Sequence, residues 1–265
     1  MMNPLRCLAV LALASVLLYG SNAQAAEDMG VFAGIHPGEV LEYSLGWGPF
    51  NVGEGVLSVQ PDVEVDGIPC HHLCLTANSN SFADAFYKVR NEYHSYVDKD
   101  KGRVIRYRIQ QHEGRTQRDA EVRFDWENLT ATYQQDGKPP RDPVALIGET
   151  WDPLSVVFRF RSFNAGENET VVIPTTDGKK LFAMEISVVR PTETKVPAGT
   201  YSTILVRPDT KDMKGVFEKS KNSKINMWYT TDAFRYPVLI KSKVIVGSFR
   251  AELKNARRIE TTATE

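Results

Sequence analysis

The sequence predicts a mainly β protein, built from one large, strongly curved antiparallel sheet or open barrel with a single mid-chain helix. Three observations predict this class. Apolar and polar residues alternate with period two in many segments, turn signals separate those segments at hairpin spacing, and helical periodicity is confined to one stretch. The alternation template predicts about eleven to thirteen strands. So many sequential strands favour a curved sheet or barrel, because curvature reduces the exposed edges.

The alternation is clearest where one face of the expected strand is apolar and the other is charged. It occurs in residues 87–98, 105–110, 121–127 and 248–254. Glycine in an Asp-Gly turn tolerates the positive φ that tight hairpins require, so these dipeptides are the strongest signals between strands. The expected turns are Pro61-Asp62, Asp66-Gly67, Asp136-Gly137, Asp177-Gly178 and Ala198-Gly199.

The predicted helix begins after Trp151. Asp152 is a good N-cap, and Pro153 suits the first helical position. Apolar residues and one arginine then follow at helical spacing up to Arg161, and Trp151 is placed to pack against Val156. A shorter helical turn is expected over residues 81–86. The mid-chain position suits a helix that plugs or caps a curved sheet.

The first 25 residues have the pattern of a secretory signal peptide. Arg6 precedes an apolar run over residues 8–18, and Ala23-Gln24-Ala25 is a small-x-small cleavage site before Ala26. The apolar run is shorter than the ~20 residues that a membrane-spanning helix needs. We therefore expect a periplasmic protein with no transmembrane anchor in the mature chain, a single β-rich domain over residues 26–260, and a frayed tail over residues 261–265.

Charge and motifs exclude several function classes. The chain has 32 basic and 33 acidic residues, and removing Arg6 with the leader leaves 31 against 33, a net charge of −2. No global field therefore attracts nucleic acid or an anionic membrane surface. The sequence contains no phosphate-binding loop, dinucleotide fingerprint, His-Glu-x-x-His or Gly-x-Ser-x-Gly motif. We therefore predict no cofactor.

Two cysteines remain after the leader, Cys70 and Cys74. In an oxidising compartment such a pair suggests a disulfide. Residues four apart in a strand, however, are roughly 13 Å apart at ~3.3 Å per residue, whereas a disulfide requires Cα atoms within about 7 Å. The pair bridges only if a bulge or turn interrupts the segment, and the sequence leaves both alternatives open.

The same segment contains zinc-type ligands. Cys70, His72 and Cys74 share one face of the expected strand, and His71 falls on the other. Consecutive same-face residues are ~6.6 Å apart, which would strain three ligands on one ion. We therefore predict no metal site and interpret the cysteines as small buried residues. His36, His94 and His112 show no partner spacing.

Two groups of residues are candidates for ligand binding. Asp152 and Arg161 lie at opposite ends of the predicted helix, where each could point into a sheet concavity; the alternative is a helix cap and an arginine on a packed helix. The second group lies near an expected strand end, where aromatic faces and charged groups suit sugar binding. Its alternative is an ordinary turn beside a core tryptophan. This group contains Trp228, Tyr229, Asp232, Arg235 and Tyr236.

Several blocks of the chain resemble the bacterial exported family known as domain of unknown function 3108. The sharpest block is Trp151-Asp152-Pro153-Leu154-Ser155, running to Arg161. The blocks follow the family's order and span nearly the whole mature chain. The resemblance implies an exported, β-rich, envelope-associated protein, and it implies no catalytic residues. The other blocks are residues 36–43, 51–55, 86–90, 95–98, 197–201, 227–232 and 246–253.

Three functional hypotheses follow. The first is a non-catalytic periplasmic binding or envelope-maintenance protein that holds a lipid, a glycan or a protein segment in the sheet concavity. The second is a hydrolase acting on envelope or imported polysaccharide, with carboxylates among Glu149, Asp152 and Asp232 spaced ~5 to 9.5 Å apart and Trp228 stacking on sugar. The third is a structural partner of an outer-membrane assembly, which predicts an exposed apolar patch rather than a cavity.

Overall fold

The computed structural model describes residues 26–209, 225–243 and 248–259. The proposed leader and the frayed tail therefore lie outside the described residues. The helices are α1 (Ser81–Asp84) and α2 (Ser155–Phe160). The strands are β1 (Glu27–Asp28), β2 (Glu39–Trp47), β3 (Phe50–Val65), β4 (Ile68–Ser79), β5 (Val89–Asp98), β6 (Val104–Glu113), β7 (Thr116–Asp125), β8 (Thr130–Gln135), β9 (Val144–Ala145), β10 (Phe163–Asn164), β11 (Thr170–Thr176), β12 (Leu181–Val196), β13 (Gly199–Pro208), β14 (Ile225–Thr230), β15 (Pro237–Lys243) and β16 (Ser248–Arg258).

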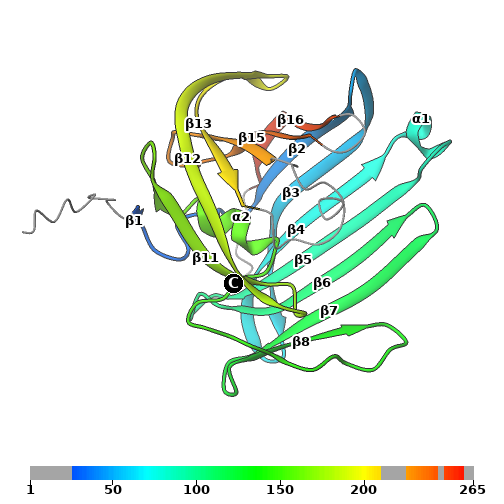
Figure 1. The fold of residues 1–265 in the computed structure, drawn as a ribbon, viewed down its shortest axis with the longest axis vertical. Coiled ribbons are helices and arrows are strands. Elements are labelled where there is room, and N and C mark those ends of the chain that lie inside the picture. The colour runs from blue at the N-terminus through cyan, green and yellow to red at the C-terminus, as the bar shows by residue number, and fades with distance from the viewer. Residues whose placement is uncertain (1–25, 210–224, 244–247, 260–265) are drawn as a thin grey trace, which may run out of the picture.

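One antiparallel sheet organises the fold (Figure 1). Its 14 strands follow the order β11-β12-β13-β14-β15-β16-β2-β3-β4-β5-β6-β7-β8-β9. The sheet consists of two meanders, β2 to β9 and β11 to β16. They are joined by the pairing of β16 with β2, which places Leu253 opposite Tyr43. The prediction of a mainly β protein with one large antiparallel sheet is therefore confirmed. The hydrogen-bond ladder is open, with β11 and β9 as its edges.

Most strand and turn predictions hold, although the Ala198-Gly199 turn lies one residue earlier, at residues 197–198. Among the described residues, β1, β9 and β10 have two residues each, which leaves thirteen longer strands. Asp66-Gly67 and Asp177-Gly178 join hairpins as expected. The turn predicted at Pro61-Asp62 is wrong, because β3 continues through it. The ladder to β4 shifts register between Gln60 and Val63 instead, since proline cannot donate a ladder hydrogen bond and a bulge accommodates it.

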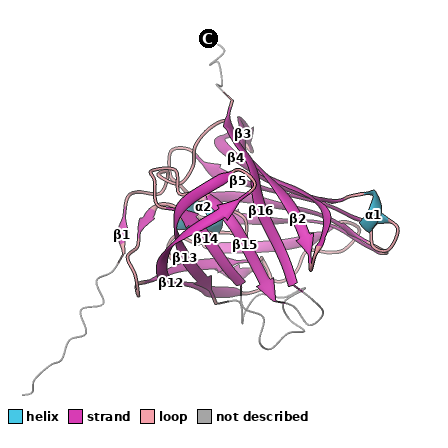
Figure 2. Cartoon of the chain, turned by 90° about the horizontal axis from the view of Figure 1, so that it is seen from above, coloured by secondary structure: helices cyan, strands magenta, loops and turns pink. Residues whose placement is uncertain are grey.

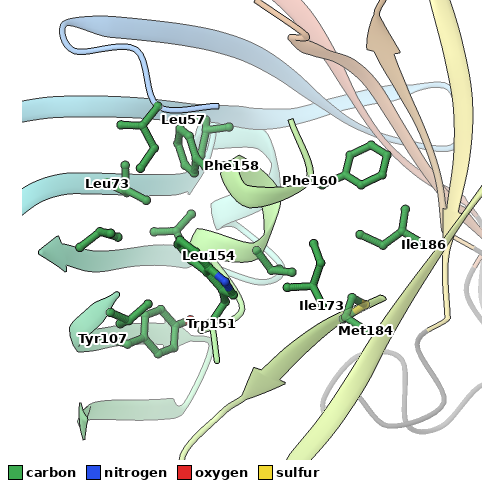
Figure 3. Packing of buried hydrophobic residues seen from close by; sticks show 14 of the residues in the cluster. Leu57, Leu73, Tyr107, Trp151, Leu154, Phe158, Phe160, Ile173, Met184 and Ile186 are labelled. Carbon is green, nitrogen blue, oxygen red and sulfur yellow. The ribbon is translucent and has the colours of Figure 1, made fainter. Parts of the chain in front are cut away.

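The interior of the fold is filled by α2 and the residues that precede it. Figure 3 shows Trp151 and Phe158 between side chains of the two meanders. Tyr107 contributes from β6 and Ile173 from β11, and all four residues belong to one buried cluster. The helix therefore plugs the interior. It begins at Ser155, later than predicted, and α1 lies within the short helical turn expected over residues 81–86.

Trp151 pairs with the edge strand β11, and the tip of the β11–β12 hairpin packs against β7 and β8. Trp151 donates its backbone N–H to the Pro174 carbonyl at 2.9 Å and accepts from the Thr176 N–H at 2.8 Å. At the hairpin tip, Gly178 has a φ of +75°, and a Cβ there would lie 2.7 Å from a methyl of Val122 on β7. Glycine at this position permits the hairpin to pack against the opposite arm without a hydrogen-bond ladder.

Cys70 and Cys74 are both buried and free. The β4–β5 ladder runs without a register shift from Cys70 opposite Asp98 to Asn78 opposite Arg90. No bulge or turn therefore brings the two sulfur atoms together, which decides against the disulfide. Burial raises the pKa of each thiol to about 11, so both cysteines carry their proton at neutral pH.

Candidate functional site

Asp152 is wholly buried beside α2 and accepts four hydrogen bonds. Its Oδ1 accepts from the backbone N–H groups of Leu154 at 2.8 Å and Ser155 at 3.0 Å. Its Oδ2 accepts from the hydroxyls of Ser95 at 2.5 Å and Ser155 at 2.6 Å. Burial raises the pKa of the carboxyl above its ordinary value, and the hydrogen bonds from Ser155 and Ser95 only partly oppose this rise. Asp152 thus fastens the start of α2 to β5.

We expect Asp152→Ala to destabilise the protein by about 2–4 kcal/mol, because two backbone N–H groups and two hydroxyls lose their buried acceptor. Asp152→Asn should cost much less, since an amide can accept from the backbone and donate to the hydroxyls. Chemical unfolding at fixed pH measures both values. Equal destabilisation by the two substitutions would contradict this assignment.

The raised pKa of Asp152 also predicts a pH trend. Its contribution to stability is fully present below the unfolded carboxyl pKa of about 3.9 and is lost as pH rises through the folded pKa. Asparagine does not ionise, so the free energy of unfolding of Asp152→Asn should rise relative to the unmodified protein as pH increases. Glu149→Gln, at an exposed position, controls for the removal of one negative charge. If the free energy of unfolding of Asp152→Asn instead falls relative to the unmodified protein as pH increases, the folded pKa of Asp152 is depressed.

Arg161 forms a buried ion pair with Glu39 at the start of β2. Its Nη1 and Nη2 donate to Glu39 Oε1 and Oε2, each at 2.7 Å. The side chains are 0% and 1% exposed. Burial raises the pKa of Glu39, and the hydrogen bonds from Arg161 oppose the rise. This ion pair holds the loop before β2 against the end of α2. Gly34 makes the close approach possible, because a Cβ at that position would lie 2.0 Å from the Phe158 carbonyl oxygen.

Arg161 also joins α2 to the turn between β14 and β15. Its Nε and Nη2 donate to the Phe234 carbonyl at 3.1 and 2.8 Å. The guanidinium lies over the rings of Phe158 and Tyr236, 5.4 and 5.5 Å from their centroids. Burial, followed by the positive charge of Arg161, lowers the pKa of neighbouring His36 to about 4. The predicted Asp152 and Arg161 therefore have separate partners and do not form a joint site.

The predicted sugar groove is not assembled around Trp228. Tyr229 is 2% exposed and packs on Phe160 with ring centroids 5.0 Å apart, so it belongs to the core. Trp228 is half-buried, and Lys241 lies over its ring at 5.7 Å. The ladder shifts register between Trp228 and Tyr229. Ligand contact by these residues stays a prediction to which the geometry adds no support.

Asp232 and Arg235 shape the β14–β15 turn. Asp232 Oδ1 accepts from the Thr230 hydroxyl at 2.8 Å and from the Arg235 N–H at 3.1 Å. Arg235 has a φ of +50°, a region that is uncommon for a residue with a Cβ. Its guanidinium donates to the Phe163 carbonyl and, at 2.9 Å, to Asn164 Oδ1. The two residues thereby attach the turn to β10.

The three carboxylates of the hydrolase hypothesis occupy different environments. Asp152 is fully buried, whereas Glu149 is exposed and lies 3.4 Å from Arg159. Asp232 is exposed and engaged in its turn. A glycosidase needs two carboxylates that flank one substrate bond, and these residues offer no such pair in one cleft.

A hollow of about 230 Å³ lies over β6 and β7. Charged and polar side chains dominate its lining, so it does not match the apolar concavity expected for a lipid. Its lining residues are Arg108, Ile109, Gln110, Asp119, Ala120, Glu121 and Asp136.

One surface feature that the sequence analysis missed is a cluster of exposed aromatic side chains, which we name the aromatic tip. Trp47 and Phe50 face each other across the β2–β3 hairpin. The Phe50 and Phe82 rings are 5.8 Å apart, and Phe82 and Phe86 are also 5.8 Å apart. Tyr87 completes the tip, with Phe86 81% exposed. Figure 2 shows α1, which carries Phe82, projecting at one end of the sheet.

The fold defines a β-rich protein with a large antiparallel sheet around an internal helix. The family model for proteins of unknown function designated DUF3108 matches residues 42–254. The chain belongs to this family, as the sequence blocks indicated. No curated protein matches the chain.

Comparison with solved structures finds similar chains from Brucella abortus and Bacteroides fragilis. A β-barrel-like protein with a DUF1849 domain, from Brucella abortus, has a TM-score of 0.53 at 9% identity, covering 84% of this chain and 98% of that one. A Bacteroides fragilis protein, provisionally described as exported and as having a YmcC-like fold, has a TM-score of 0.29 at 10% identity, covering 84% and 97%. The first likeness supports the fold alone, and the second is too low to carry an argument. Neither helix in the described part of the chain has the length and apolarity for a membrane crossing.

Proposed function

We propose that this chain is an exported, non-catalytic envelope protein that attaches to a lipid surface through its aromatic tip. The observation that carries the proposal is the contiguous exposure of Trp47, Phe50, Phe82, Phe86 and Tyr87 at one end of the sheet. Phenylalanine and tryptophan side chains on peripheral proteins bury in the boundary between headgroups and acyl chains. Export and a periplasmic address come from the leader pattern of residues 1–25 and remain part of the proposal.

The filled interior favours this surface over a ligand in the sheet concavity. Trp151, Phe158 and Phe160 occupy the space between the two meanders. The contacts of the β11–β12 hairpin with β7 and β8 support our interpretation of a strongly curved, open-barrel arrangement. The space inside this arrangement is occupied by the chain's own helix α2. Of the three hypotheses, the third predicts an exposed apolar patch, and the aromatic tip fits this expectation of an envelope-contacting protein best.

Charge around the aromatic tip favours a lipid surface over a protein pocket. Lys88 and Arg115 are exposed on the two connections beside Tyr87, and the Gly114 N–H donates to the Lys88 carbonyl at 2.8 Å. Basic side chains near inserted aromatic rings attract anionic headgroups. Helix α1, which carries Phe82, projects at one end of the sheet (Figure 2), a shape that suits insertion into a bilayer.

The opposite end of the same strands has a different surface. Its turns contain charged, exposed residues, including Asp66, Lys99 and Asp100. Asp66 is paired with Arg106 at 2.7 Å and Lys99 is paired with Asp62. This end is suited to water, so the two ends of the sheet give the protein a defined orientation on a lipid surface.

Co-sedimentation with vesicles tests the proposal. The purified protein is expected to sediment with vesicles of phosphatidylethanolamine and phosphatidylglycerol, and more weakly with vesicles of phosphatidylcholine alone. Added salt should narrow this difference, because it screens the contribution of Lys88 and Arg115. Failure to sediment with either vesicle would contradict attachment to lipid. Capture of an envelope protein through the aromatic tip, without vesicle binding, would replace the lipid with a protein partner.

A further inference from the structure

The face of β4 and β5 opposite the main core brings together a thiol, an imidazole and a carboxylate. Cys74 and His94 are direct partners across the β4–β5 ladder, and Glu92 lies two residues before His94 on the same face. One ligand atom from each of the three residues lies within 4.8 Å of the others. His94 Nε2 is 3.1 Å from Glu92 Oε1. These groups take no part in the aromatic tip.

We propose that Cys74, Glu92 and His94 bind a zinc ion. Zinc takes thiolate, imidazole and carboxylate ligands at about 2.0–2.3 Å in tetrahedral geometry, so two ligand atoms of one ion lie about 3.3–3.8 Å apart. The observed ligand atoms lie within 4.8 Å of one another, and side-chain rotation brings them to these separations. Binding forms an S–Zn bond as the thiol proton of Cys74 passes to solvent. Three protein ligands leave the fourth tetrahedral position to water.

A fourth residue, His72, orients the imidazole of His94. His72 Nε2 lies 2.9 Å from His94 Nδ1, and the His72 ring stacks on Tyr96 with centroids 4.8 Å apart. If Nδ1–H of His94 donates to His72, the lone pair on Nε2 points to the side of Glu92. Metal-binding histidines commonly have such a partner on the second nitrogen, which sets the tautomer and the ring orientation.

Charge at the cluster is compatible with a divalent cation. A Cys74 thiolate and the Glu92 carboxylate together balance the two positive charges of zinc. Arg108 is opposite His94 on β6, and Glu121 is opposite Arg108 on β7. The carboxylate of Glu121 pairs with Arg123 at 2.5 Å and lies 3.9 Å from Arg106, so the two charges that balance zinc are those of Cys74 and Glu92.

Titration of the purified, reduced protein with Co²⁺ and Zn²⁺ tests the site. We expect one equivalent of Co²⁺ to bind, with the near-ultraviolet thiolate-to-cobalt charge-transfer absorption that a Cys ligand produces, and Zn²⁺ to displace it. Cys74→Ser and His94→Gln should abolish this absorption. His72→Gln should weaken zinc binding by about 10–100-fold while retaining the absorption.

Matched variants distinguish ligands from residues that only support the fold. Cys70→Ser removes the other buried thiol of β4, and His112→Gln removes a histidine paired with Asp119 at 3.1 Å; both should bind like the unmodified protein. Glu92 is 47% exposed, so Glu92→Gln should keep the melting temperature and weaken zinc binding about 10-fold or more. The absence of stoichiometric binding, or equal loss in Cys70→Ser and Cys74→Ser, would overturn the proposal. Because no lipid is present, this result is independent of vesicle attachment.

Discussion

Arg161→Met is expected to lower the free energy of unfolding by about 3–5 kcal/mol, because it leaves the carboxylate of Glu39 buried without its partner. The substitution also removes two donors from the Phe234 carbonyl. Methionine fills much of the vacated volume, so the loss reports mainly the unpaired charge and the unsatisfied carbonyl. Urea unfolding followed by circular dichroism measures the effect.

The destabilisation should increase with pH. Without Arg161, burial is the largest influence on Glu39, opposed only by the charge of Arg258, and it raises the folded pKa above the unfolded value of about 4.3. The stability of Arg161→Met is therefore fully present below that value and is lost as pH rises through the folded pKa. Adding Glu39→Gln removes the charge and should restore much of the stability at pH 8.

A surface pair provides the matched control. Arg257 lies 3.1 Å from Glu42, and their side chains are 55% and 31% exposed. Arg257→Met should cost at most about 1 kcal/mol, since exposed ion pairs contribute little. A similarly small loss for Arg161→Met would contradict the assignment of the Glu39–Arg161 pair as the link between β2, α2 and the β14–β15 turn.

Replacing Phe82 and Phe86 together by serine is expected to weaken vesicle binding by about 100-fold. Burial of a phenylalanine side chain contributes about 1.5–3 kcal/mol, and each 1.4 kcal/mol is a factor of ten in affinity. Both rings are more than half exposed, so their loss should change the free energy of unfolding by no more than about 0.5 kcal/mol. Titration with vesicles of phosphatidylethanolamine and phosphatidylglycerol gives the two affinities.

Two aliphatic residues outside the aromatic tip provide the control for this pair. Leu129 and Ile147 are 51% and 59% exposed. The double substitution Leu129→Ser and Ile147→Ser removes comparable apolar surface and should leave vesicle binding unchanged. Equal weakening by the two double variants would show that general surface hydrophobicity, rather than the aromatic tip, causes binding.

Local sequence patterns predict where strands and hairpins occur. They predict less well which strands pair with one another in space. Period-two alternation and Asp-Gly dipeptides identified strands such as β7 and hairpins such as Asp177-Gly178, because side-chain direction and positive φ are local properties. The turn prediction at Pro61-Asp62 is wrong because a bulge accommodates the same residues within a strand. The pairing of β16 with β2 joins the two meanders, and no local signal specifies it.

In the candidate sites, too, the sequence indicates individual residues but not their partners in space. The sequence predicts ligand binding by Asp152 and Arg161, with a helix cap and a packed arginine as the alternative. Their partners Ser95 and Glu39 lie 57 and 122 residues away. The Glu39–Arg161 pair joins two of the sequence blocks that resemble the family. His94 appeared isolated because its neighbour Cys74 lies on another strand, and register cannot be derived from one strand alone. The alternation that placed Glu92 and His94 on one polar face was the available signal.

Attachment through the aromatic tip is tested most directly with a polarity-sensitive dye at Phe86→Cys. The native thiols of Cys70 and Cys74 are buried, and each has a pKa of about 11, so labelling should be confined to the introduced cysteine. We predict that anionic vesicles shift the emission to shorter wavelength and that acyl-chain spin labels quench it. The same dye at Asp100→Cys, on the opposite end of the sheet, should show neither change. Vesicle binding with no change at Phe86→Cys, or with quenching at Asp100→Cys, would contradict attachment through the aromatic tip.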